Sequence, residues 1–278
     1  MLEIPESTTL ARQLNETVRS KTIRSVVANA SPHKFAFYSG DPATYPALLT
    51  GRTIGKSFGI GAMVELLAGD CRIVFSDGAN LRYCESADQA PAKHQLLLEF
   101  EDGSTLVCSV QMYGSVQALP VSDDPGKYYR LAKEKPLPLC AAFDRAYFTS
   151  LCGAGTEKLS SKAFLATEQR IPGLGNGVLQ DILFRAGVHP KRKMGTLSAG
   201  ELDGLFYAVK NTLAEMTRLG GRDTEKDLFG NPGRYRTILS RNTCGTPCPV
   251  CGAEIQKAAY MGGAVYWCPA CQPLPETN

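Results

Sequence analysis

The chain has 278 residues, of which 44% are hydrophobic and 21% are charged, and this composition excludes collagen-like, coiled-coil and disordered proteins. Two domains are expected at this length. No run reaches the roughly 18 apolar residues of a membrane span. The N-terminal MLEIPESTTLARQLNET has no apolar signal region, so we expect a cytoplasmic protein. The net charge of +3 alone implies no polyanionic partner, but residues 151–278 hold 15 basic against 11 acidic side chains, so a phosphate-binding surface would be sought in that half.

The first half of the chain has one helical pattern followed by a long β-type region. Apolar spacing predicts a helix over residues 7–19. From residue 21 to residue 120, short β-type runs alternate with Gly, Asp and Asn turns such as SDGAN and EDGS. The sequence therefore predicts a mostly antiparallel sheet there, and the proline-containing stretch 120–140 is typical of a linker.

Helical spacing dominates the second half. It occurs in EKLSSKAFLATEQ and again in GVLQDILFRAG. A long helix is predicted to begin at Ser198, where Glu201 completes a capping box, and to end at Gly220-Gly221.

Four of the ten cysteines have the spacing C-x2-C-x16-C-x2-C near the C-terminus. Each C-x2-C turn can present two thiolates to one ion, and a short hairpin would bring the turns together. We therefore expect one zinc, which is structural because four protein ligands leave no open position. Cys244 lies just outside this spacing and is not expected to bind the metal. The predicted ligands are Cys248, Cys251, Cys268 and Cys271.

The segment IPGLGNGVLQDILFRAG places a glycine-rich turn before a helix. A dinucleotide-binding fingerprint requires a preceding strand, whereas the preceding SSKAFLATEQR is helical. Backbone N–H groups at such a helix start, together with the Asn176 side chain, can bind one phosphate. A tight turn between helices without any ligand explains the segment equally well.

With these segments in place, the chain resembles the formamidopyrimidine-DNA glycosylase and endonuclease VIII family. The resemblance is carried by MLEIPE, the segment around GLGN, the following RAGVHP, and the finger ending in CPACQ. It implies an α+β fold with an N-terminal antiparallel β-sandwich flanked by helices and a C-terminal helix–two-turn–helix domain with a four-cysteine zinc finger. The expected boundaries are residues 1–125 for the sandwich, 126–142 for a linker, 143–242 for the helical domain and 243–278 for the finger.

The resemblance also implies a function in base-excision repair. Such a protein binds damaged double-stranded DNA, turns a nucleotide out of the duplex and removes the base, with AP lyase strand cleavage as a further activity. We expect a monomer in the cytoplasm, associated with the nucleoid, with the structural zinc and no small-molecule cofactor. Lys162, fourteen residues before Asn176, matches a family lysine, and the pair is expected to contact DNA phosphate.

The expected catalytic positions depart from the family pattern. Leu2 stands where the family has a proline whose free amine is the nucleophile, so the α-amine of Met1 is the remaining N-terminal candidate. Glu3 and Glu6 match the family's acidic positions. The family's lysine of the first sheet corresponds to Ala62.

Three further positions concern DNA contacts. Lys56 is the nearest substitute for the missing sheet lysine. QMYG stands where the family has Arg-Arg-Phe-Gly, which leaves Tyr113 as a candidate aromatic wedge without the gap-filling arginine. The phosphate-holding arginine of the finger corresponds to Ala264.

Other interpretations remain open. Glu3 and Glu6 also suit the positive end of a helix dipole, and Tyr113 suits a sheet. The three histidines are widely separated and favour structural roles, while residues 220–227 are either a solvated loop or a base-covering lid. For the whole protein, the alternatives are a non-catalytic lesion-binding protein on the same scaffold and a zinc-ribbon protein that acts on RNA or another protein.

Overall fold

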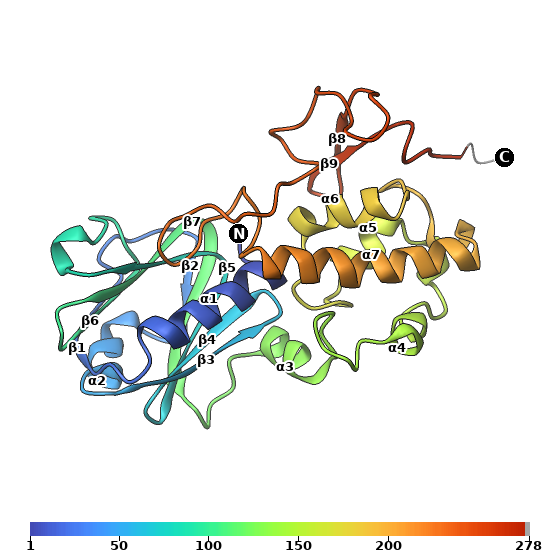
Figure 1. Ribbon diagram of the computed structural model, residues 1–278. Coiled ribbons are helices and arrows are strands. Elements are labelled where there is room, and N and C mark those ends of the chain that lie inside the picture. Colours follow the sequence, from blue (N-terminus) through green and yellow to red (C-terminus); the bar gives the residue numbers. More distant parts are fainter. Residues whose placement is uncertain (276–278) are drawn as a thin grey trace. The chain divides into compact units, whose positions relative to one another are not determined.

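The computed structural model describes residues 1–275, which divide into two units. The first unit consists of residues 1–133 and 219–235, and the second of residues 134–218 and the described residues from 236 onward (Figure 1). These limits differ from the expected boundaries in two places. Residues 127–134 of the expected linker form a helix, and residues 219–235, which were expected in the helical domain, belong to the first unit.

The first unit is built around one seven-stranded sheet, in the order β1-β6-β7-β5-β4-β3, with β2 added alongside β7. All pairs are antiparallel except the parallel pair of β2 and β7. The strands are β1 (Ile23–Ala28), β2 (Ala36–Tyr38), β3 (Ile54–Ile60), β4 (Met63–Ala68), β5 (Cys71–Cys84), β6 (Leu96–Phe100) and β7 (Thr105–Pro120).

The two long strands, β5 and β7, connect two layers. The first part of β5 pairs with β4 and the end of β7, whereas its last part pairs with the beginning of β7, which in turn pairs with β6. The register shifts between Asp77 and Ala79, and such a bulge lets a strand bend from one layer into another. The core contains side chains from both layers, among them Phe75, Leu81 and Phe100. The expected β-sandwich is thus confirmed.

The bulge corrects one detail of the sequence interpretation. SDGAN was expected to be a turn, but it lies inside β5, which keeps its pairing with β7 on both sides of the bulge. EDGS, in contrast, does form the turn between β6 and β7.

Helices cover both faces of the sheet. α1 (Ile4–Thr17) begins three residues before the expected helix, with Pro5 in its first turn, and buries Leu10 and Leu14. The short α2 (Tyr45–Leu49) places Tyr45 and Leu49 in the core. On the other face, α3 (Lys127–Glu134) packs Tyr129 and Ala132 against β3, β4 and β5.

The second unit is helical. Its helices are α4 (Arg145–Ser150), α5 (Ser161–Ala166), α6 (Asn176–Arg185) and α7 (Ala199–Arg218). The predicted capping box of α7 is confirmed, because Glu201 N–H donates to Ser198 Oγ at 3.2 Å and Ser198 N–H donates to Glu201 Oε2 at 2.8 Å. An antiparallel hairpin of β8 (Gln256–Tyr260) and β9 (Gly263–Trp267) follows. No helix in the described residues is long and apolar enough to cross a membrane.

Candidate functional site

The start of α1 is anchored to the bulge of β5. The Leu2 side chain is buried, and its N–H donates to the carbonyl oxygen of Asp77 at 2.7 Å. Glu3 follows as the N-cap residue of α1, in extended conformation. Its side chain is only 3% exposed, so the sequence places a carboxylate inside the protein immediately after a core residue.

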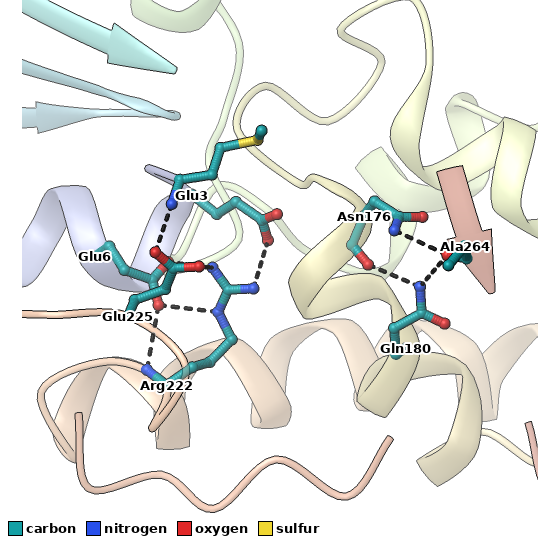
Figure 2. Close-up of polar contacts among 8 residues, drawn as sticks. Glu3, Glu6, Asn176, Gln180, Arg222, Glu225 and Ala264 are labelled. Carbon is teal, nitrogen blue, oxygen red and sulfur yellow. Dashed lines mark hydrogen bonds and ion pairs between the residues drawn. The ribbon is translucent and has the colours of Figure 1, made fainter. Parts of the chain in front are cut away.

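A buried arginine gathers the acidic residues of this region (Figure 2). Arg222, from the segment 219–235, is 3% exposed and binds Glu6 through three donors: its backbone N–H at 3.2 Å, Nε at 3.0 Å and Nη2 at 2.9 Å. Its Nη1 lies 3.6 Å from Glu3 Oε2, and Nη2 lies 3.9 Å from Glu225. The ammonium group of Met1 also pairs with Glu225.

The charges of this cluster determine its electrostatics. Burial disfavours a charged guanidinium, but the neighbouring Glu3 and Glu6 carboxylates outweigh burial and raise the pKa of Arg222 above its usual range. Arg222 therefore stays charged.

Asp77 and Tyr113 lie beside this cluster. Asp77 has φ +57°, a left-handed conformation that is uncommon outside glycine but that Asp and Asn adopt more readily than most residues. The Tyr113 side chain is 42% exposed. Partial burial, and to a lesser extent the charges of Asp77 and Glu3, raise its pKa.

Lys56 is on the opposite face of the sheet from α1. Gly59 of β3 faces α1, since a Cβ there would lie 2.9 Å from Thr8 Cα. The Lys56 ammonium instead lies 5.1 Å from the ring centre of Phe58, which Lys133 of α3 also approaches. The structure therefore does not bring Lys56 to Glu3.

The position of the missing lysine is next to α1. Ala62 is in the turn between β3 and β4, and the preceding Gly61 carbonyl accepts a hydrogen bond from Ser7 Oγ at 2.6 Å. A side chain on this turn would be near the start of α1, but alanine supplies no functional group.

In the second unit, Lys162 and Asn176 meet the finger hairpin. Lys162 Nζ donates to the Tyr260 carbonyl at 2.6 Å, and Asn176 Nδ2 donates to the Ala264 carbonyl at 3.0 Å (Figure 2). Gln180, one turn further along α6, also donates to Ala264 and accepts from the Tyr266 N–H. Burial lowers the pKa of Lys162. These side chains thus connect α5 and α6 to β8 and β9.

The four predicted zinc ligands come together, and their Sγ atoms all lie within 4.8 Å of one another. Cys248 and Cys271 are 3.8 Å apart, which is also the separation of about 3.8 Å expected for two thiolates 2.3 Å from a tetrahedral zinc. Burial alone would raise the pKa of Cys248, but hydrogen bonds from the Val250 and Cys251 amides lower it to about 7. The donor set and spacing fit a structural zinc.

Comparison with known proteins identifies the family. No family model matches the chain. The formamidopyrimidine-DNA glycosylase of Symbiobacterium thermophilum is 30% identical, over 99% of this chain and 90% of that protein. This chain belongs to the formamidopyrimidine-DNA glycosylase family. A Bacillus cereus formamidopyrimidine-DNA glycosylase is 27% identical over 98% of this chain and 99% of its own length.

Solved structures of this glycosylase family have the same fold. The MutM (Fpg) protein of Thermus thermophilus aligns with a TM-score of 0.80 and 24% identity, covering 99% of this chain and all of that one. The Lactococcus lactis Fpg in complex with DNA containing an abasic site aligns with a TM-score of 0.82, covering 97% of this chain and 99% of that one. The resemblance inferred from GLGN, RAGVHP and the finger is confirmed.

Three residues of this glycosylase-family chain were missed by sequence reasoning. Arg222 was noted only as part of a loop, Asp77 as part of a turn, and Gln180 not at all. A lone arginine after two glycines is a weak signal, and neither the left-handed backbone of Asp77 nor the carbonyl that Gln180 meets is visible in the sequence.

Proposed function

We propose that this protein removes damaged bases from duplex DNA as a DNA glycosylase of base-excision repair. The proposal rests on the full-length similarity to formamidopyrimidine-DNA glycosylases, and the observation that carries it is the buried Glu3 carboxylate beside Arg222. A carboxylate held in a fixed position inside the protein can accept and donate a proton during the reaction.

The reaction requires a nucleophile at the sugar C1′ and a proton for the departing base. In the simplest form, a water oxygen bonds to C1′ while the C1′–N bond breaks, and the electron pair of that bond leaves with the base. Glu3 would take a proton from the water and pass it to the departing base, which leaves neutral. If the amine of Met1 attacks instead, a Schiff base forms and AP lyase strand cleavage can follow. That amine pairs with Glu225 and must first lose its proton.

Other residues would hold the DNA. We assign Lys162 and Asn176, with the zinc finger they support, to contacts with backbone phosphates, which position a duplex without reading its sequence. Tyr113, partly exposed, would stack in the space left by the extruded base. Lys56 is exposed on β3 and would serve as a phosphate contact outside the catalytic cluster. Glu6 supports the site through Arg222.

The test measures base release from duplexes that carry an oxidised purine or an oxidised pyrimidine, and borohydride trapping on these duplexes and on a duplex that carries an abasic site. A glycosylase releases a damaged base, and borohydride traps it covalently only if it forms a Schiff base. Glu3→Gln should lower base release by about 10²-fold, the usual size of a general acid–base contribution, and leave binding to abasic duplex unchanged. Leu2 favours one competing function, that of a non-catalytic lesion-binding protein, because the Leu2 nitrogen is an amide and cannot attack C1′. Tight binding to abasic duplex with neither base release nor trapping would identify a non-catalytic lesion-binding protein.

A further inference from the structure

We infer that Arg222 is a positioning residue, which fixes Glu3 for the reaction by binding Glu6 and holding the segment 219–235 against α1. The inference deepens the proposed glycosylase function and rests on it. It assigns different roles to the two buried glutamates: Glu6 anchors Arg222, and Glu3 moves the proton.

The geometry around Arg222 separates these roles. Glu6 receives three donors at hydrogen-bond distance, so both of its oxygens are engaged by Arg222. The contact from Arg222 to Glu3 is longer, at 3.6 Å, and acts through charge instead of a short hydrogen bond. Glu6 therefore fixes the orientation of the Arg222 guanidinium, which places a positive charge beside Glu3. A planar guanidinium suits this arrangement, since its donors have fixed directions.

The backbone is adapted to this contact. Gly221 has φ +96°, and a Cβ at this position would lie 3.4 Å from Glu6 Oε1. The left-handed glycine lets the following N–H of Arg222 reach the same carboxylate that the side chain binds. The segment is thus closed onto Glu6 by both main-chain and side-chain groups, which argues against a freely moving lid.

A second attachment of the same segment provides a matched control. Gln13 Nε2 donates to Asp227 Oδ2 at 3.0 Å, and the Leu228 N–H donates to Gln13 Oε1 at 3.0 Å. Gln13 is seven residues beyond Glu6 on α1, which is about 10 Å along a helix axis. Substitution of Gln13 therefore loosens the segment at a distance from Glu3.

The experiment compares wild type with Arg222→Ala, Arg222→Met and Gln13→Ala. Single-turnover base release, affinity for an abasic duplex and the folded fraction are measured for each protein. Both Arg222 variants should lose about 10²-fold in the rate of base release while abasic-duplex affinity stays within about threefold of wild type. Gln13→Ala should lose stability but keep its rate. Added guanidinium ion should partly restore the rate of base release in Arg222→Ala, because the alanine leaves room for it. It should not restore the rate in Arg222→Met, where the methionine side chain fills the space. Sodium ion at equal ionic strength should restore the rate of neither variant.

The outcomes distinguish the two proposals. If Gln13→Ala loses as much rate per folded molecule as Arg222→Met, or if guanidinium has no effect, Arg222 has only a structural role and the inference is wrong although wild type is active. If wild type releases no base from any of the duplexes, the proposed function fails and the inference fails with it. If Arg222→Ala and Arg222→Met do not fold, Arg222→Lys takes their place, because lysine keeps the positive charge but lacks the planar guanidinium. A wild-type rate of base release in Arg222→Lys would overturn the inference.

Discussion

Loss of the Glu6–Arg222 pair should destabilise the first unit strongly, and the two residues should be energetically coupled. Glu6→Leu removes the acceptor of three hydrogen bonds from the buried Arg222, two from its guanidinium and one from its backbone N–H. Breaking such a buried pair from one side costs about 3–5 kcal/mol. Arg222→Met leaves two buried carboxylates without their shared cation and should cost a similar amount. The double variant removes both charges of the pair, so its loss should be smaller than the sum, with a coupling free energy of about 2 kcal/mol.

The assay must report on the first unit. The single tryptophan, Trp267, lies in the second unit, so its fluorescence serves as the control signal. Hydrogen exchange of peptides from α1, combined with urea unfolding followed by circular dichroism, gives the free energy of unfolding of the first unit for all four proteins. Additive single-variant losses, with a coupling below about 0.5 kcal/mol, would refute the assignment of this pair as one buried unit.

Four further predictions concern other parts of the chain. Burial lowers the pKa of His189 to about 4, below the 6.5 of an unfolded histidine. The free energy of unfolding should therefore fall as the pH drops from 6.5 toward 4, and it should fall less steeply in His189→Asn. Urea unfolding monitored by Trp267 fluorescence measures this. Cys271→Ser should abolish zinc binding, measured by metal analysis, and remove hydrogen-exchange protection from the finger. Lys162→Met should loosen the hairpin and weaken binding to damaged and undamaged duplexes by similar factors in titrations, because phosphate contacts are not lesion-specific. Asp77→Ala should lower the melting temperature more than Asp77→Asn, since asparagine tolerates a left-handed backbone better.

The features of the fold that could be predicted from sequence are encoded by short-range spacing. The capping box of α7 and the four-cysteine cluster both form where the spacing placed them. SDGAN shows where this reasoning ends. Asp-Gly occurs in both SDGAN and EDGS, but only EDGS is a turn, because β5 continues to pair with β7 beyond its bulge. The outcome depends on a partner strand about 35 residues away, which the local pattern does not contain.

The sequence identified the acidic residues of the site but not the arginine that binds them. Glu3 and Glu6 were identified through the resemblance, whereas Arg222 is 216 residues from Glu6 in sequence. Only the return of the segment 219–235 to the first unit brings the two together. A long-range pair of this kind has no periodic signature. Its members look like ordinary solvated charges until their burial is known, and the sequence interpretation of Arg222 as part of a loop followed from this.

One departure from the family pattern, Leu2, is built into the contact between the start of α1 and the bulge of β5. Leu2 stands where the resemblance places a proline, and it contributes both a buried side chain and an N–H that donates to Asp77. A proline inside the chain has no N–H to donate, so this contact depends on the change at position 2. Asp77 in turn adopts the left-handed backbone at the β5 bulge, and its charge, with that of Glu3, acts on Tyr113. Leu2 therefore fixes the backbone from which the buried Glu3 side chain extends. Under the proposed glycosylase function, this is the carboxylate that would move the proton.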